Sequence, residues 1–263
     1  MTDIPTLSFC ITCKNRFHQI RQTLRKNLDD NGSHSAYIDF VLVDFDSTDG
    51  LHEWVIDEFS TELASGYLKY YRTEELPLWH ASVAKNTAHL CASGKILVNL
   101  DCDNFTGACG GVYLINTFIR KGNQIVTHQF NGRHGYGTFG RIAMLSEYFY
   151  LLCGYNESFD PMGFQDSDLI DRSVKMGLQY VLLNDDRYNL AIPNSKKESI
   201  ALTGSTKFFM EMLEHNQTIS FLNLSEGRLI ANSGRFGIRK NLFDHNGKEF
   251  FPKIIKYGKT SIQ

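Results

Sequence analysis

Two carboxylates, Asp101 and Asp103, stand one residue apart directly after a short apolar run at residues 96–100. A run this short and this rich in branched side chains is typical of a strand buried on both faces of a parallel sheet. Open α/β sheets bind ligands beyond the carboxyl ends of their strands, so a ligand is expected there. The two charges repel unless they are compensated, and Mg²⁺ or Mn²⁺ carrying a phosphate would compensate them. The alternative is a turn in which both carboxylates cap backbone amides.

Polar side chains also follow two earlier strand-like runs, at residues 7–12 and 37–43. Because the carboxyl ends of parallel strands share one edge of a sheet, the three loops are expected to converge. This convergence predicts a binding site more strongly than any one loop does. The polar residues of the three loops are Lys14, Asn15, Arg16, Asp44, Asp46, Asp101 and Asp103.

The first hundred residues alternate between strand and helix patterns. The expected strands are residues 7–12, 37–43, 67–71 and 96–100, and the expected helices are residues 17–28, 51–59 and 78–91. This alternation predicts an α/β fold with a mostly parallel central sheet flanked by helices and right-handed crossovers. Asp49 is predicted to cap the helix at 51–59.

The second half is less regular. It is expected to contain strands at 124–129, 141–145 and 179–183, and helices at 111–120, 146–152, 165–176 and 206–214. Residues 135–140 match the GxGxxG pattern, but a strand-like run follows them, which argues against dinucleotide binding. These glycines instead favour a close backbone approach or a sharp turn. No linker divides the chain, so residues 1–263 are predicted to form one domain, with a nucleotide-binding half (1–104), an acceptor half (105–200) and a C-terminal extension (201–263).

Composition narrows the class of protein. The 263 residues carry a formal net charge of −2, which does not indicate a general nucleic-acid binder. The N-terminus lacks the basic and apolar regions of a signal peptide, so a cytoplasmic location is expected. Residues 250–259 mix aromatic and apolar side chains with lysines. This tail is expected to fold back on the domain, with a peripheral membrane or partner-protein contact as the alternative.

The elements in this order resemble the GT-A glycosyltransferases, in particular the family 2 type, over about residues 6–185. TCKNR at 12–16 resembles their first nucleotide-binding loop, and VLVDFDSTDG at 41–50 resembles the second. Lys85-Asn86, followed by ASG at 92–94 and DCD at 101–103, is similar to the helix that leads to the DXD motif. GYNESFDPMGFQDSDLIDR at 154–172 is similar to a galactosyltransferase-type C-terminal segment.

The resemblance implies an inverting, metal-dependent enzyme that moves a hexose or N-acetylhexosamine, galactose type favoured, from a UDP-sugar to a glycan acceptor hydroxyl. Asp166 would be the general base, and a single displacement would invert the anomeric centre. Asp101 and Asp103 would hold Mn²⁺ or Mg²⁺. The implied nucleotide-binding residues are Thr12, Lys14, Asn15, Arg16, Asp44, Asp46, Lys85, Asn86 and Asp101. The implied acceptor-binding residues are Gly163, Phe164, Gln165 and Asp168.

Some positions depart from the family pattern. Phe45 and Asp46 stand where the family often has Asp and Gly, and Gln165 stands where it usually has Glu. A third metal ligand has no clear position, and His215 and His245 are candidates. Asp166 and Asp168 could instead serve the first turn of a helix, Asp168 by holding the helix start.

Two other functions stay open. One is a GT-A domain that binds a nucleotide sugar or a glycan without transfer, which Gln165 favours. The other is a sugar nucleotidyltransferase, against which the absence of glycines in TCKNR argues.

Overall fold

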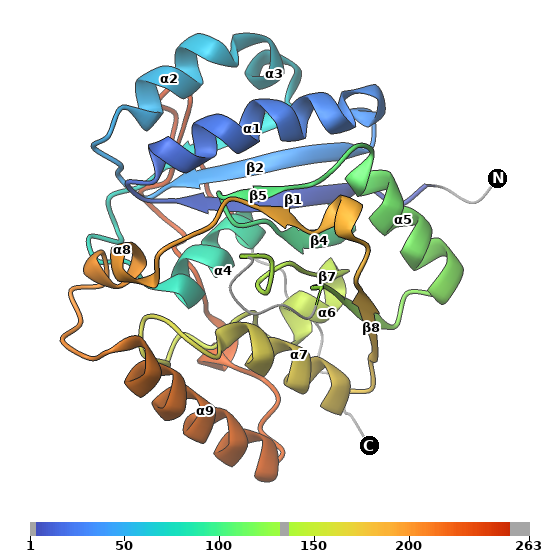
Figure 1. The fold of residues 1–263 in the computed structure, drawn as a ribbon, viewed down its shortest axis with the longest axis vertical. Coiled ribbons are helices and arrows are strands. Elements are labelled where there is room, and N and C mark those ends of the chain that lie inside the picture. Colours follow the sequence, from blue (N-terminus) through green and yellow to red (C-terminus); the bar gives the residue numbers. More distant parts are fainter. Residues whose placement is uncertain (1–3, 132–136, 253–263) are drawn as a thin grey trace.

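The computed structural model describes residues 4–131 and 137–252, and eight of their strands form one sheet in the order β10-β3-β2-β1-β4-β7-β6-β8 (Figure 1). The strands of this sheet are β1 Leu7–Cys13, β2 Ile38–Asp44, β3 Leu68–Arg72, β4 Ile96–Asn99, β6 Ile125–Gln129, β7 Ile142–Leu145, β8 Gln179–Leu183 and β10 Phe243–Asp244. A separate two-stranded sheet joins β5 Asn104–Phe105 to β9 Leu190–Ala191.

The helices alternate with these strands through the first half of the chain. They are α1 Phe17–Asn31, α2 Leu51–Glu58, α3 Ser60–Ser65, α4 Ala81–Cys91, α5 Gly110–Lys121, α6 Ser146–Leu151, α7 Gln165–Lys175, α8 Lys196–Ala201 and α9 Phe209–Ser225. Single 3₁₀ turns lie at Gly32–His34, Asp186–Tyr188 and Asn232–Gly234.

Strands β1 to β4 are parallel, with β1 paired to β2 on one side and to β4 on the other. Strand β7 is antiparallel to both β4 and β6, and β6 and β8 are again parallel. The prediction of an α/β fold with a mostly parallel sheet flanked by helices is therefore confirmed. The carboxyl ends of β1, β2 and β4 point to the same edge of the sheet, because these strands run in the same direction.

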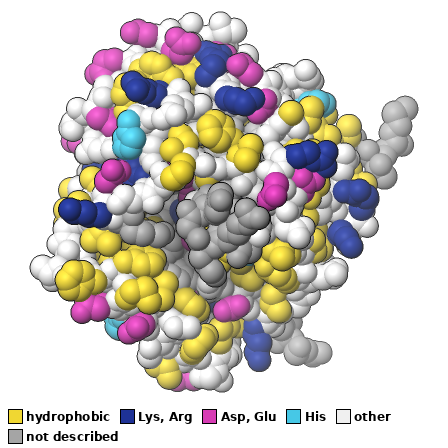
Figure 2. All heavy atoms as spheres, in the orientation of Figure 1, with side chains coloured by type: hydrophobic (Ala, Val, Ile, Leu, Met, Phe, Trp, Pro, Cys, Tyr) yellow, Lys and Arg dark blue, Asp and Glu magenta, His cyan; other side chains and the backbone are white. Residues whose placement is uncertain are grey.

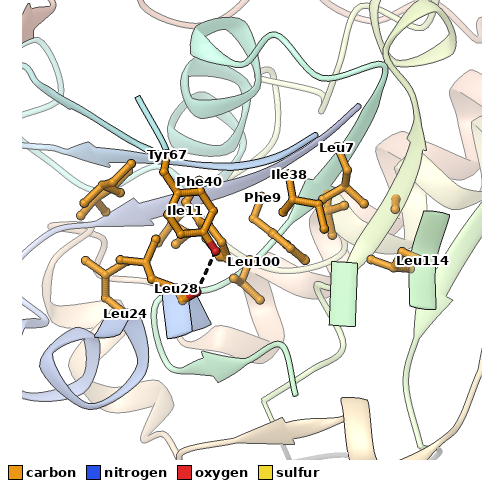
Figure 3. Close-up of a cluster of buried hydrophobic side chains, with 14 of the residues drawn as sticks. Leu7, Phe9, Ile11, Leu24, Leu28, Ile38, Phe40, Tyr67, Leu100 and Leu114 are labelled. Atoms are coloured by element: carbon orange, nitrogen blue, oxygen red, sulfur yellow. Dashed lines mark hydrogen bonds between the residues drawn. The ribbon is translucent and has the colours of Figure 1, made fainter. Parts of the chain in front are cut away.

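Alternation along the strands divides the core into two layers. Phe9 faces α1, where it packs in one cluster with Leu24 and Leu28 (Figure 3). In the same cluster the Tyr67 hydroxyl donates to the Leu28 carbonyl at 2.7 Å, so this buried phenol keeps a partner. Cys10, one residue on from Phe9, faces the opposite layer, which contains α4. Helices therefore cover both faces, as expected for a strand buried on both sides.

The predicted capping role of Asp49 is wrong. The residue before α2 is Gly50, at φ +91°, and it caps without a side-chain hydrogen bond. Asp49 Oδ2 instead accepts from the backbone N–H of Phe17 at 2.8 Å, at the first residue of α1. A carboxylate is favourable at either helix start, and the fold brings Asp49 to the helix that is more distant in sequence.

Two predictions fall partly outside the described residues: positions 135 and 136 of the glycine segment, and residues 253–259 of the C-terminal tail. Within the part of the chain that the structure describes, no helix is both long and apolar enough to span a bilayer. On the face shown in Figure 2, acidic and basic side chains are interspersed among groups of hydrophobic ones.

Candidate functional site

The loops after β1 and β2 are joined by direct hydrogen bonds. The Lys14 ammonium donates to the Phe45 carbonyl at 2.7 Å. The side chain of Asn15 accepts from the Thr48 backbone N–H at 2.8 Å, while its own backbone N–H donates to Ser47 Oγ at 2.9 Å. The predicted convergence of these two loops is therefore seen in the structure.

Asp44 lies at the base of this pair of loops, and its side chain is fully buried. Its carboxylate accepts from the Ser47 backbone N–H at 2.9 Å and from the Tyr70 hydroxyl at 2.8 Å. Burial, and secondly the negative charge of Asp44, raise the pKa of Tyr70 well above its usual value, so the phenol remains a donor. Asp46 is paired with Arg72, whose guanidinium lies 2.6 Å from Asp46 Oδ1.

Arg16, at the end of the first loop, is held by a second part of the chain. Its Nε donates to Gln19 Oε1 at 2.6 Å, and its Nη1 donates to Ser199 Oγ in α8 at 2.9 Å. Thr12 is buried in β1 beside this loop. The segment around α8 thus lies against the nucleotide-binding loop that the sequence predicts.

Asp103 is 4% exposed, and amide donors hold both of its carboxylate oxygens. Asn104 Nδ2 donates to Oδ1 at 2.6 Å, and Asn194 Nδ2 donates to Oδ2 at 3.0 Å. Burial, followed by repulsion from Asp101, raises the pKa of Asp103 to about 6. The pair therefore carries the charge repulsion that the sequence predicts, with amides in part compensating it.

Asp101 and Asp166 are brought together by one lysine. Lys85, in α4, lies with its Nζ 2.7 Å from Asp166 Oδ1 and 3.6 Å from Asp101 Oδ1. Burial alone would lower the pKa of Lys85, but the Asp101 and Asp166 carboxylates outweigh it and raise that pKa. Asn99 Nδ2 also donates to Asp101 Oδ1, at 3.0 Å.

The backbone of Gly140 packs directly against this cluster of Lys85, Asp101 and Asp166. A Cβ at this position would lie 2.8 Å from both Asp101 Oδ2 and Lys85 Nζ, and 3.4 Å from Asp166 Oδ2. Only a residue without a side chain allows the backbone to approach so closely. The described part of the glycine segment thus makes the close approach that its composition predicts, here to side chains of the candidate site.

The predicted acceptor residues lie at the start of α7. Gly163 and Phe164 both have left-handed backbone conformations, with φ of +94° and +63°. They set the direction in which the helix leaves the loop. Gln165 Nε2 donates to Asp166 Oδ2 at 3.1 Å, so this side chain supports the Asp166 carboxylate.

Asp168 is fully buried and faces α9. Its Oδ2 accepts from Arg172 Nε at 2.8 Å, and its Oδ1 accepts from Ser220 Oγ at 2.8 Å. These contacts match a role in holding the start of α7 and leave no oxygen of Asp168 facing solvent. A carboxylate and a lysine or arginine four residues apart on a helix is the sequence signal for this pair.

Asn86 also has a full set of partners, and they lie in the segment before α7. Its Nδ2 donates to the Tyr155 carbonyl and to Glu157 Oε1, both at 2.8 Å, and its Oδ1 accepts from the Tyr155 backbone N–H at 2.8 Å. The side chain therefore anchors the segment that leads into α7. Lys85 and Asn86 are neighbours in sequence and serve different parts of the fold.

The two histidine candidates for a third metal ligand lie elsewhere. His215 Nδ1 is 2.8 Å from Asp160 Oδ2. His245 lines a cavity of about 490 Å³ beside β10, together with His52 and Arg72. Across residues 4–131 and 137–252, no three His, Cys, Asp or Glu side chains gather as a metal site.

Asp101 and Asp103 nevertheless fit a hard divalent cation that brings ligands of its own. Both are carboxylates, the ligand type that Mg²⁺ and Mn²⁺ prefer, and Mg²⁺ in proteins is commonly bound by one or two carboxylates plus substrate phosphates. After burial, repulsion between the two carboxylates raises the pKa of Asp103, and a nearby positive charge would give further compensation. A cation would supply it, provided that Asn194 gives up its hydrogen bond to Oδ2.

Several residues that build this site are not predicted from the sequence. Arg141, fully buried, donates through Nη2 to Asn104 Oδ1 at 2.8 Å and so orients the amide that holds Asp103. Burial lowers the pKa of Arg141 to about 10, against the opposing effect of Asp101 and Asp103. Asn104, directly after DCD, could have been found from its position, whereas Asn194 and Arg141 carry no local signal.

No family model and no curated protein matches the chain. Solved structures do match it. One is a mannosyltransferase from Pyrobaculum calidifontis in complex with GDP-Man and Mn²⁺, with 16% sequence identity and a TM-score of 0.59, covering 85% of this chain and 71% of that chain. Another is TarS 1–349 from S. aureus in complex with UDP-GlcNAc, with 15% identity and a TM-score of 0.62, covering 83% and 67%.

A third match is GalNAc-T7 with UDP, GalNAc and Mn²⁺, with 15% identity and a TM-score of 0.58. It covers 70% of this chain and 43% of that chain, so this chain spans under half of that protein's length. At sequence identities this low, the structural matches establish the architecture alone. The chain has the GT-A fold of glycosyltransferases, as the resemblance in the sequence predicts.

Proposed function

We propose that this protein is an inverting, metal-dependent glycosyltransferase that uses a UDP-sugar, with galactose-type sugars favoured, and a glycan acceptor hydroxyl. The observation that carries the proposal is the Lys85 ammonium between Asp101 and Asp166, which joins a candidate cation ligand to a candidate base. The GT-A fold supports it, as do the ligands of its structural neighbours, which include GDP-Man, UDP-GlcNAc, UDP and Mn²⁺.

Each group of residues has one task in the reaction. The loops after β1 and β2 bind the nucleotide through Thr12, Lys14, Asn15, Arg16, Asp44 and Asp46. Asp101 and Asp103 would hold the cation, which when bound would supply positive charge to neutralise the leaving diphosphate. Gly163, Phe164 and Gln165 shape the acceptor side of the site. Asn86 and Asp168 contribute by anchoring the chain around α7, in keeping with their contacts.

Asp166 accepts the proton of the acceptor hydroxyl. The acceptor oxygen forms a bond to the anomeric carbon while the bond from that carbon to the diphosphate oxygen breaks, and the electron pair leaves with UDP. Asp166 Oδ1 is held by Lys85, and Gln165 supports Oδ2. Displacement in one step from the side opposite the leaving group inverts the anomeric centre.

The test is a transfer assay with Mn²⁺, a panel of glycoside acceptors, and UDP-galactose, UDP-GalNAc, UDP-GlcNAc or GDP-mannose as donor. We expect nucleotide release with a UDP-sugar and an inverted product by NMR. Asp166→Asn should reduce the rate by about 10² to 10⁴, the usual contribution of a general base. Asp171→Asn, on the same helix, is the matched control and should leave the rate unchanged. Tight nucleotide binding with no turnover of any donor would instead favour the binding-only function.

A further inference from the structure

We propose that Lys85 is a positioning residue that couples Asp101 to Asp166, so that a change at either carboxylate alters what binds at the other. The inference rests on the proposed function, in which Asp101 belongs to the donor side and Asp166 to the acceptor side. It adds a physical link between the two half-sites, carried by one ammonium group.

The surroundings of Lys85 hold its ammonium in place. Its side chain is 6% exposed, with Nζ at 2.7 Å from Asp166 Oδ1 and 3.6 Å from Asp101 Oδ1. The Tyr155 ring lies on another side, with its centroid 5.4 Å from Nζ. Gly140 closes the cluster, since a Cβ there would lie 2.8 Å from Nζ. Among the residues that the structure describes, no third carboxylate is paired with this ammonium, and the Tyr155 ring and the Gly140 backbone leave it little room to move.

One positive charge at this place serves two negative ones. When both carboxylates are ionised, the Lys85 ammonium is attracted to both of them. Its attraction to one carboxylate keeps it from moving closer to the other and so weakens its interaction with that one. Removing the charge of Asp166 leaves the ammonium to Asp101 alone. Lys85 then competes more strongly with any cation for Asp101, because a buried ammonium without a second partner binds the remaining carboxylate.

The coupling must also work in reverse. If Asp166 affects cation binding at Asp101, then cation binding at Asp101 affects Asp166 by the same free energy, because linkage between binding equilibria is reciprocal. A cation on Asp101 would weaken the hold of Asp101 on Lys85 and leave the ammonium to Asp166. Donor binding would therefore fix the position of the base before the acceptor is used.

The test is a double-mutant cycle read by Mn²⁺ binding in the presence of UDP, with free Mn²⁺ measured by electron paramagnetic resonance. The four proteins are wild type, Asp166→Asn, Lys85→Met and the double variant. In the wild-type background, Asp166→Asn should weaken Mn²⁺ binding at least about fivefold, the lower end of typical coupling between sites. In the Lys85→Met background, it should change binding by less than about twofold. Asp171→Asn should have no effect in either background.

A second variant covers the case in which Lys85→Met does not fold. Gly140→Ala removes no charge, and its Cβ would lie 2.8 Å from both Asp101 Oδ2 and Lys85 Nζ, which forces these flexible ends apart. In this background too, Asp166→Asn should lose its effect on Mn²⁺ binding. Equal effects of Asp166→Asn in all backgrounds would overturn the coupling. Absence of Mn²⁺ binding by wild type would overturn the proposed function as well, and it is seen before any variant is made.

Discussion

Asp103→Asn is expected to make the metal-free protein more stable at neutral pH. Burial, with Asp101 beside it, raises the pKa of Asp103 from 3.8 to about 6, so the folded state holds this proton more tightly than the unfolded chain does. Stability is therefore lost as the pH rises from about 4 to about 6, and the loss persists above that range. A raised pKa of about 2 units corresponds to about 3 kcal/mol in the free energy of unfolding. Asparagine cannot ionise and avoids this loss.

Hydrogen bonding reduces the gain. Asn104 and Asn194 both donate to Asp103, and an asparagine at this position keeps one acceptor oxygen. The exposed Asn194 side chain can rotate to accept instead, at a cost of about 1 kcal/mol for a less favourable hydrogen bond. The net gain at pH 7.5 is therefore about 1 to 3 kcal/mol. The variant should also lose cation binding at this position, so Mn²⁺ with UDP should no longer stabilise it.

Urea unfolding of the metal-free protein at pH values from 5 to 7.5 measures the effect. Wild type should lose stability between pH 5 and about 6 and then level off, and Asp103→Asn should lose less over that interval. Asp57→Asn, on the exposed side of α2, is the matched control and should follow wild type. A variant that is no more stable than wild type at pH 7.5, with the same pH slope, would show that ionised Asp103 does not destabilise the folded protein.

Two further substitutions test how the site is supported. Asp168→Asn leaves the buried Arg172 guanidinium without its carboxylate and should lower the free energy of unfolding in urea by about 3 to 5 kcal/mol. The control is Asp185→Asn, which removes an exposed pair with Arg187 and should change this free energy little. Gly94→Ala would place a Cβ 2.5 Å from the backbone N of Ser8, between β1 and β4, and should cost about 1 to 3 kcal/mol in thermal unfolding. Gly32→Ala, with no heavy atom within 4 Å of its Cβ, should be close to neutral, and equal losses in both glycine variants would contradict the packing argument.

The first half of the fold was predictable because its signals are local. Short apolar runs followed by polar loops give β1, β2 and β4 with their ends at one edge, and the predicted helices match α1, α2 and α4 closely. The second half depends on pairing between distant segments. Strand β7 enters antiparallel between β4 and β6, and the strands β5, β9 and β10 have two residues each, which is too short for any periodic pattern.

The features of the site also separate into those with a local sequence signal and those that depend on distant segments. Its loop residues could be predicted from their position after strands, but the contacts between them could not. Lys85 and Asp166 are 81 residues apart, and their ion pair depends on how the whole fold places α4 relative to α7. Residue type alone also did not separate Asp166 from Asp168, which are two positions apart on one helix. Only the packing of α9 shows that Asp168 is turned inward to Arg172 and Ser220.

Calorimetric titration with UDP, in the presence of Mn²⁺ and again with chelator, shows whether Asp101 and Asp103 form a metal-dependent nucleotide site. We expect binding that needs the metal and that is lost in both Asp101→Asn and Asp103→Asn, while Asp57→Asn binds as wild type does. UDP binding that is unchanged by chelator and by both aspartate substitutions would contradict the metal-dependent site. No binding of UDP under any of these conditions would contradict the proposed nucleotide site at this edge of the sheet.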